Sequence, residues 1–272
     1  CYKLIHTFKI SFDLRHKIKK WFHGILMPRG KNFVYNPELE QAWIHIDVIS
    51  HSKTISAIYK IADKQAPTVI LCHPYLAESR QFFLKRGHAD MYLEMGLNVV
   101  IFDFNGFGHS PFVNFHYHED LDLVARYFKT NFSFTSFICH GVSFGASQVI
   151  TYTSQASHLI DKIIIENCLD SNFSYYKKRN SKLYNIMRLL MVVLPNVNKN
   201  HDYIKAAAKI HSVSKSLLIY NSEDDLTTVE MGNKIKNALT IPTEMSIFAG
   251  KHLEAYDKNK SNYIKVINAF VS

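Results

Sequence analysis

The 272-residue chain contains few of the residues that mark several structural classes. It has only 10 glycines and 7 prolines and no internal repeat, which excludes collagen-like and linker-like stretches. No apolar run reaches the roughly 18–20 residues that span a bilayer. The four cysteines follow neither a zinc-ligand spacing nor a disulfide framework; they are Cys1, Cys72, Cys139 and Cys168. We therefore expect a globular protein with one sizeable core, reduced cysteines, no bound metal and no cofactor.

The charge of the chain is predominantly positive, with 32 Lys and Arg against 23 Asp and Glu and a formal net charge of +9. A basic surface can favour anionic membranes, acidic substrates or nucleic acid. The basic residues are scattered except near the N-terminus, and no nucleic-acid-binding motif accompanies them. The sequence therefore predicts no nucleic-acid partner, and it does not indicate an oligomeric state.

Residues 1–39 form a basic amphipathic segment ahead of the main domain. Within it, bulky apolar side chains recur at helical spacing, namely Leu14, Ile18, Trp21, Phe22 and Ile25. The preferred interpretation is a terminal helix packed on the domain, and the alternative is a helix that contacts a membrane surface peripherally. The chain begins with Cys1, so two locations stay open. These are the cytoplasm, which the reduced cysteines favour, and a membrane anchored through a lipidated Cys1.

The rest of the chain, residues 40–272, shows the pattern of an α/β domain. Residues 42–50 and 54–62 alternate polar and apolar side chains and predict a hairpin. Six short apolar runs then predict strands buried on both faces, at 68–74, 98–104, 135–141, 162–167, 216–221 and 244–250. Helical patterns lie between most of them or follow the last, at 80–95, 119–129, 144–156, 229–239 and 261–271. We expect a mostly parallel central sheet of about eight strands with helices on both faces.

One gap between predicted strands is too long for a simple connection. Residues 168–215 contain two helical patterns, "SKLYNIMRLLMVVLP" and "HDYIKAAAKI". Long insertions between sheet strands often cover a binding site. We therefore predict a helical cap or lid over this range, and the same apolar side chains could equally pack on the body of the domain.

The sequence "GVSFG" at 141–145 lies between a predicted strand and a predicted helix. This is the context in which a Gly-x-Ser-x-Gly pattern forms a nucleophile elbow, a sharp turn that exposes the serine hydroxyl. A serine nucleophile needs a base, and the base needs an orienting acid. Both follow in the required chain order, since Asp224 and Asp225 come after one predicted strand and His252 comes after the last. The predicted catalytic residues are Ser143, His252 and Asp224, with Asp225 as the alternative acid.

Taken together, these motifs resemble the α/β-hydrolase superfamily over about residues 40–271. "DFNGFGHS" at 103–110 is similar to the D-x-x-G-x-G-x-S stretch that the superfamily carries after an early strand, and "AGKH" is similar to its histidine motif. The register of the acid-bearing turn in this superfamily favours Asp224 over Asp225. The resemblance extends to lysophospholipase-like, monoacylglycerol-lipase-like and serine aminopeptidase-like members.

The resemblance also implies an oxyanion hole made of two backbone N–H groups. One is expected from Phe144, the residue after the serine. The other is expected from the loop after the first buried strand, where many members carry His-Gly. This chain has His73-Pro74 instead, and proline has no N–H. Tyr75 matches the donor position, with Leu76 as the fallback.

The expected activity is that of a serine hydrolase, an esterase, lipase or thioesterase acting on an acyl chain through an acyl-enzyme. Its partner would be a small-molecule acyl ester or thioester. Three alternatives stay open: an acyltransferase that uses the same triad, a peptidase, and a binding protein on an inactive hydrolase fold.

Overall fold

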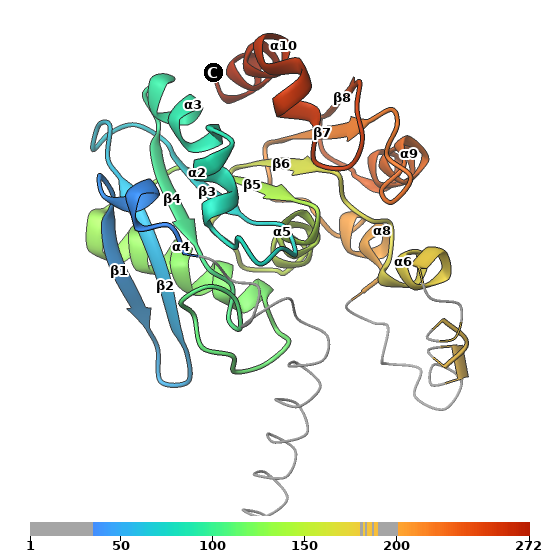
Figure 1. The fold of residues 1–272 in the computed structure, drawn as a ribbon, viewed down its shortest axis with the longest axis horizontal. Helices are drawn as coiled ribbons and strands as arrows, with labels where there is room; N and C mark the ends of the chain where they lie inside the picture. Colours follow the sequence, from blue (N-terminus) through green and yellow to red (C-terminus); the bar gives the residue numbers. More distant parts are fainter. Residues whose placement is uncertain (1–34, 180–181, 183, 187, 190–200) are drawn as a thin grey trace, which may run out of the picture.

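The computed structural model describes residues 35–179, 182, 184–186, 188–189 and 201–272. These residues form one sheet of eight strands in the order β1-β2-β4-β3-β5-β6-β7-β8 (Figure 1). The strands are β1 (Ile44–Ile49), β2 (Thr54–Lys60), β3 (Thr68–Cys72), β4 (Asn98–Phe102), β5 (Phe137–Val142), β6 (Lys162–Glu166), β7 (Lys215–Asn221) and β8 (Thr243–Phe248). β2 pairs antiparallel with both β1 and β4, and all other pairs are parallel. The predicted hairpin and the mostly parallel sheet are confirmed.

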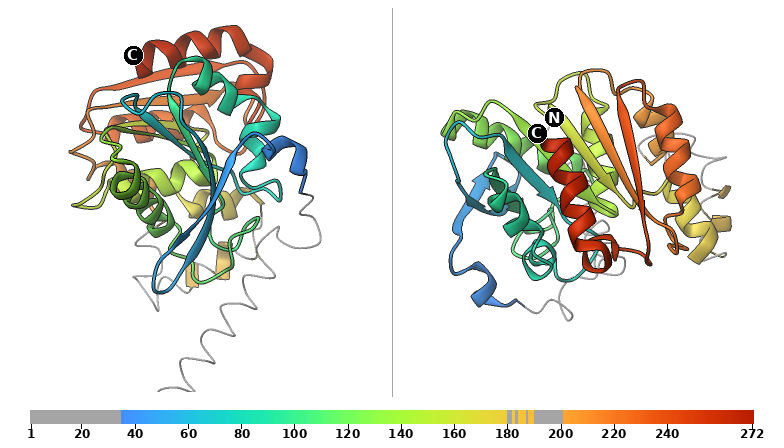
Figure 2. Two further views of the ribbon diagram at one scale, coloured as in Figure 1. Left: turned by 90° about the vertical axis from the view of Figure 1, so that its left-hand side faces the viewer. Right: turned by 90° about the horizontal axis from the view of Figure 1, so that it is seen from above.

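Helices cover both faces of the sheet. One face carries α4 (His118–Phe132), α5 (Phe144–Thr153), α8 (Tyr203–Ala207) and α9 (Val229–Ala238). The other face carries α2 (Gln81–Lys85), α3 (His88–Glu94) and α10 (Ala255–Val271), with the short 3₁₀ helix η1 (Pro37–Glu40) against α2. In the left view of Figure 2, α10 and α4 lie on opposite sides of the strands. The sheet is therefore buried between two helical layers.

The continuous apolar runs of the strands follow from this three-layer arrangement. Successive side chains of a strand point to opposite faces, so a strand buried on both sides needs apolar residues at every position. In β3, Ile70 and Cys72 pack in the core beneath α4 and α5, while Val69 and Leu71 pack in the core beneath α10. In β5 the same alternation puts His140 on the face of α3 and α10, together with Ile138 and Val142, and its ring contacts Tyr92 of α3 and Glu166, which in turn binds Tyr263 of α10.

Two helices differ from their predicted bounds. The helix expected over 80–95 is two helices, α2 and α3, because Gly87 adopts a left-handed conformation with φ of 78° between them. The helix expected over 261–271 begins earlier, at Ala255 in α10, and contains a kink at Asn259.

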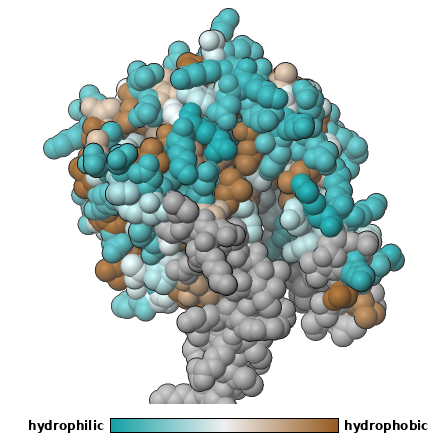
Figure 3. Space-filling model, in the orientation of Figure 1, coloured by the Kyte–Doolittle hydropathy of each residue, from teal (hydrophilic) through white to brown (hydrophobic). Residues whose placement is uncertain are grey.

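The structure describes only parts of two predicted segments, the N-terminal segment 1–39 and the insertion 168–215. The basic amphipathic helix at 9–31 lies outside the described residues. Within the predicted insertion 168–215, the structure describes α6 (Asn172–Arg179), α8 and an isolated bridge between Ser171 and Asp202. Two apolar side chains of this range, Ile186 and Leu189, are exposed, and Figure 3 shows a small hydrophobic patch at the lower right of the molecule. Across the described parts of the chain, no helix is both long and apolar enough to cross a membrane.

Candidate active site

Ser143 occupies a strained turn between β5 and α5. Its φ of 53° and ψ of −110° are unfavourable for a residue with a side chain. The two glycines of the motif make this turn sterically feasible. A Cβ at Gly145 would overlap the carbonyl oxygen of Cys72, and a Cβ at Gly141 would lie 2.6 Å from the backbone of Ala146. The motif therefore lets the start of α5 approach the end of β3 closely.

Three side chains from distant parts of the sequence meet at this turn. The Nε2 atom of His252 lies 3.1 Å from the Oγ atom of Ser143, and its Nδ1 atom lies 2.6 Å from Oδ2 of Asp224. Asp224 follows β7 and His252 follows β8, so both come from the carboxyl edge of the sheet, as Ser143 does. The structure thus brings together the three residues that the sequence predicts for a triad, and it leaves a hydroxyl, an imidazole and a carboxylate in hydrogen-bonded order.

Asp224 is held by more groups than His252 alone. Its Oδ1 atom accepts the backbone N–H groups of Leu226 and Thr227 at 2.8 and 2.9 Å. Its Oδ2 atom accepts the Thr227 hydroxyl and the Asn167 side-chain amide as well as His252. Asp225, the alternative acid, is exposed, and its backbone carbonyl accepts Lys178 at 2.6 Å. No contact between the Asp225 side chain and His252 is present among the described residues.

The protonation pattern of the site follows from these contacts. Burial acts to raise the pKa of Asp224, but hydrogen bonds from His252 and Thr227 and the His252 charge outweigh it and hold the pKa below its ordinary value. An ionised carboxylate accepts only, so Nδ1 of His252 carries the proton that points to Asp224. In the neutral ring Nε2 is then an acceptor, and the Ser143 hydroxyl donates to it. This is the arrangement that general-base catalysis requires.

The loop after β3 lies against the start of α5. The side chains of Tyr75 and Phe144 are in edge-on contact, with ring centroids 5.5 Å apart. His73 shapes the loop, because its Nε2 accepts the Phe104 N–H at 3.1 Å and its Nδ1 lies 2.8 Å from the Pro74 carbonyl. Burial lowers the pKa of His73, in keeping with a neutral ring that donates to Pro74.

Backbone hydrogen bonding in the same loop distinguishes Tyr75 from Leu76, the two residues predicted as the second oxyanion donor. The Leu76 N–H donates to the Pro74 carbonyl at 2.8 Å, so it already takes part in a tight turn. Tyr75 is next to Phe144 and remains the predicted donor on the basis of its position in the loop.

No family model matches the chain, and no curated protein matches it in sequence. Solved structures do match. The esterase Pf2001 of Pyrococcus furiosus is 17% identical, with a TM-score of 0.70 over 90% of this chain and 96% of that one. A putative hydrolase from Agrobacterium vitis S4 is 14% identical, with a TM-score of 0.64 over 85% and 98%. An alpha-beta serine hydrolase homologue from Coxiella burnetii is 16% identical, with a TM-score of 0.60 over 84% and 97%.

The chain has the α/β-hydrolase fold. Within this fold, residues 103–110 have a structural role. The Asp103 carboxylate accepts the backbone N–H groups of Arg80 and His109, both at 3.0 Å, and a Cβ at Gly108 would overlap that carboxylate. The Ser110 hydroxyl donates to the Asp103 carbonyl at 2.6 Å. These contacts close the loop after β4 on itself.

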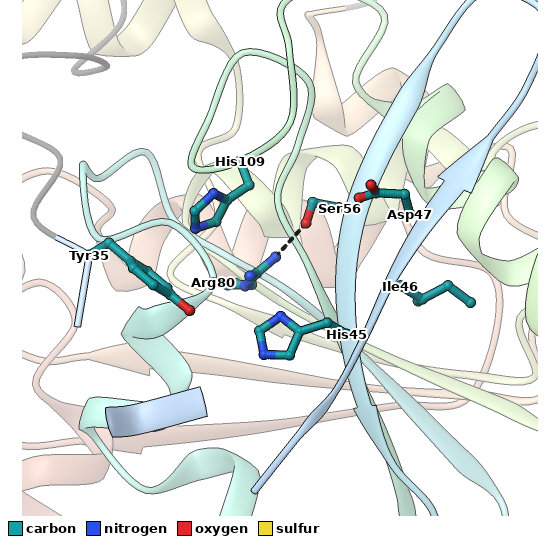
Figure 4. A pocket seen from close by; sticks show the side chains of 7 residues that line it. All are labelled: Tyr35, His45, Ile46, Asp47, Ser56, Arg80 and His109. Atoms are coloured by element: carbon teal, nitrogen blue, oxygen red, sulfur yellow. Dashed lines mark hydrogen bonds between the residues drawn. The ribbon is translucent and has the colours of Figure 1, made fainter. Parts of the chain in front are cut away.

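A polar hollow of about 470 Å³ lies on the β1–β2 side of the α/β-hydrolase fold, and Ser143, Asp224 and His252 are not among its lining residues (Figure 4). Its lining is Tyr35, His45, Ile46, Asp47, Ser56, Arg80 and His109. The Arg80 guanidinium donates to both carboxylate oxygens of Glu40, at 2.9 and 2.7 Å, and to the Ser56 hydroxyl at 2.9 Å. Arg80 thus joins η1 to β2 and to the loop that holds Asp103, which is a structural role.

Among the described residues, the side chains that could hold a metal ion do not gather at any one place. The described part of the chain contains no group of three or more His, Cys, Asp or Glu side chains with suitable geometry. The pair His116 and His118, which the motif "HYH" draws attention to, has ring centroids 6.2 Å apart, and His116 lies beside Glu119.

Sequence reasoning missed two residues of this site, Asn167 and Thr227. Both donate to the carboxylate of Asp224. A signal for Asn167 does exist, because "KIIIEN" ends a buried strand with two polar residues at the edge of the sheet where ligands bind in this class of fold. Thr227 gave no such signal, since a threonine next to a turn is common.

Proposed function

We propose that this protein is a serine hydrolase that cleaves a carboxylic ester or thioester through an acyl-enzyme intermediate. The observation that carries the proposal is the unbroken hydrogen-bonded chain from Asp224 through His252 to Ser143. The strained backbone of Ser143 supports it, because such conformations persist where the surrounding fold enforces them and gather at active sites. The similarity to a Pyrococcus furiosus esterase supports it at the level of the fold.

In the proposed mechanism, His252 acts through its Nε2 atom. It takes the proton of the Ser143 hydroxyl as Oγ attacks the acyl carbonyl, and it later gives that proton to the leaving group. Asp224 keeps the Nδ1 proton in place and stabilises the imidazolium that forms. The backbone N–H groups of Phe144 and Tyr75 bind the oxyanion. Water then attacks the acyl-enzyme, with His252 again as the base.

The surroundings of Phe144 favour an apolar acyl group. Its ring contacts four other aromatic rings at centroid distances of 5.0–5.7 Å, those of Tyr75, Phe104, Phe107 and Tyr117. Tyr176 of α6, within the predicted insertion, lies close enough to Tyr75 that its phenol raises the pKa of Tyr75, although burial is the larger cause. An acyl chain bound at Ser143 would meet aromatic rather than charged side chains.

Labelling with a fluorophosphonate probe tests the proposal directly, because such a probe reacts with an activated serine. We expect the natural chain to be labelled and Ser143→Ala to be inert. Ser147→Ala is the matched control, since Ser147 lies one turn along α5 and is buried at 2% exposure. It should be labelled like the natural chain. Labelling that survives in Ser143→Ala would contradict the assignment of the nucleophile.

A panel of p-nitrophenyl esters and acyl thioesters of graded chain length would then define the substrate. We expect kcat/KM to rise from acetyl to medium-length acyl groups, because each buried methylene contributes about 0.8 kcal/mol. A preference for acetyl esters over all longer ones would contradict the acyl-chain assignment. Peptide substrates and acyl acceptors other than water, added to the same assay, address the peptidase and acyltransferase alternatives.

A further inference from the structure

The carboxyl end of β6 contacts both ends of the Ser143–His252–Asp224 chain. The backbone carbonyl of Glu166 accepts the Ser143 N–H at 2.8 Å, and this bond continues the pairing of β5 with β6 beyond Val142. The next residue, Asn167, donates its side-chain amide to Oδ2 of Asp224 at 3.0 Å. Two consecutive residues therefore bind the amide of the serine and the carboxylate that His252 contacts.

Asn167 adopts a conformation that serves this contact. Its φ is 49°, in the left-handed region that asparagine tolerates better than most residues with a side chain. Its own N–H donates to the Ile219 carbonyl of β7 at 2.8 Å, which ties the backbone of this residue to the strand that leads to Asp224. The side chain is fully buried, so its amide is held where it meets Asp224 without competition from solvent.

The Glu166 side chain is anchored on the face of the sheet that carries α3 and α10. Its Oε2 atom accepts the Tyr263 hydroxyl at 2.5 Å and lies 3.1 Å from Nε2 of His140. The Nδ1 atom of His140 lies 2.9 Å from the Tyr92 hydroxyl. All four side chains are at most 2% exposed. The end of β6 is thus fixed by a buried polar cluster that reaches α3 and α10.

We propose that Asn167 is a positioning residue of the active site that sets the carboxylate of Asp224, at the end of β6 where the backbone carbonyl of Glu166 binds the Ser143 N–H. The inference rests on the proposed hydrolase function. Asn167 acts through Asp224, because its amide disperses the negative charge on the same oxygen that faces His252 and restricts the rotation of that carboxylate. Substrate is not required to touch Asn167.

Two variants of Asn167 test this role. Asn167→Asp keeps the size and the tolerance for positive φ but replaces the donor with a carboxylate oxygen. Asn167→Gly removes the side chain and accepts the backbone conformation without strain. The matched control is Asn221→Ala, because Asn221 is a buried asparagine at the end of the neighbouring strand β7 and its side chain makes no hydrogen bond among the described residues.

We expect both Asn167 variants to lower kcat on the best p-nitrophenyl ester, about tenfold for glycine and about a hundredfold for aspartate, with KM within twofold. The acid limb of the kcat/KM profile should move to higher pH in both, because a carboxylate that loses a donor stabilises the protonated imidazole more strongly. Asn221→Ala should leave kcat and the profile unchanged. A purely structural role for Asn167 would lower the amount of folded enzyme without moving the pH profile.

The outcomes separate this inference from the proposed function. An active, fluorophosphonate-reactive natural chain whose Asn167→Gly and Asn167→Asp variants keep kcat and the pH profile would overturn the positioning role alone. A natural chain that neither reacts nor hydrolyses any ester would overturn the proposed function first. If either Asn167 variant fails to fold, the other decides, and thermal unfolding of each variant identifies that case.

Discussion

Two histidine–carboxylate pairs of the molecule differ in their place in the sheet: one lies at its carboxyl edge and the other is buried on the face that carries α3 and α10. His252 contacts Asp224 at 2.6 Å and points its second nitrogen at the Ser143 hydroxyl. His140 contacts Glu166 at 3.1 Å and points its second nitrogen at the Tyr92 hydroxyl. His140 is only three residues from Ser143 in the chain, yet the alternation of β5 turns it toward α10.

The difference between the two pairs lies in what surrounds the hydroxyl. The His252 side chain is 21% exposed, and Ser143, at the strained turn, is partly exposed. The His140 pair is buried, with 0% and 2% exposure, and Tyr92 lies fully in the core. The same three chemical groups therefore give a candidate catalytic site in one place and a buried anchor in the other. Solvent access to the hydroxyl and the backbone geometry of its residue therefore decide the role of such a pair.

Removing each histidine is the strongest way to test this comparison. We expect His252→Ala to lower kcat/KM by about 10⁴-fold or more, because the serine then lacks its base. Its effect on the free energy of unfolding should stay within about 1 kcal/mol, since the side chain is partly exposed. His140→Ala should do the reverse, destabilising the fold by about 3 kcal/mol with a much smaller loss of kcat per folded molecule. Ester kinetics and urea unfolding on the same preparations check both, and equal activity losses would contradict the division of roles.

Replacing Asp224 and Asp225 by asparagine, one at a time, tests which aspartate orients His252. Asp224→Asn should lower kcat by about 10³–10⁴-fold, because an amide no longer holds the Nδ1 proton of His252. Asp225→Asn is the matched control and should change kcat less than twofold, since the Asp225 side chain is exposed. The two kcat values on one ester decide the matter, and the opposite order would make Asp225 the acid.

The buried pair should matter most for stability. We expect Glu166→Gln to lower the free energy of unfolding by about 2 kcal/mol, because hydrogen bonds to a charged group are lost or weakened inside the core. Tyr263 and His140 both bind the carboxylate oxygen that this change neutralises. Urea unfolding of the two chains measures the difference. An unchanged midpoint would show that the charge of Glu166 contributes nothing to the anchor.

The same variant predicts a dependence on pH. Burial acts to raise the pKa of Glu166, but hydrogen bonding to His140 and Tyr263 and the charge of His140 outweigh it, so the pKa is lowered. A carboxylate with a lowered pKa stabilises the fold above its unfolded pKa of about 4.3, and this stabilisation is lost as pH falls through the folded pKa. The stability advantage of the natural chain over Glu166→Gln should therefore be full near pH 7 and shrink below about pH 4. An advantage that grows on acidification would contradict the sign.

The smallest effect is expected at Tyr92, whose hydroxyl contacts His140 of the buried pair. Tyr92→Phe removes the hydroxyl next to Nδ1 of His140 and should destabilise the fold by about 1 kcal/mol. We expect kcat to stay within twofold, because three successive contacts, through His140 and Glu166, separate Tyr92 from the Ser143 backbone. Thermal unfolding and ester kinetics check this, and a tenfold loss of kcat would extend the positioning cluster to α3.

Sequence by itself determined the class of fold and the candidates for the site. Apolar runs indicated strands buried on both faces, and the Gly-x-Ser-x-Gly spacing indicated the turn after β5, because both patterns are local. The order of Ser143, Asp224 and His252 along the chain marked them as candidates, and their roles stay predictions.

Only the tertiary structure decided which side chains meet. It turned Asp224 toward His252 and left Asp225 exposed, a difference of one residue that no local pattern measures. It also brought Asn167 into contact with Asp224 and placed His140 with Glu166 on the face that carries α3 and α10. These contacts join residues 26–57 positions apart. They depend on strand order and on the direction of each side chain, which the fold sets when the sheet assembles.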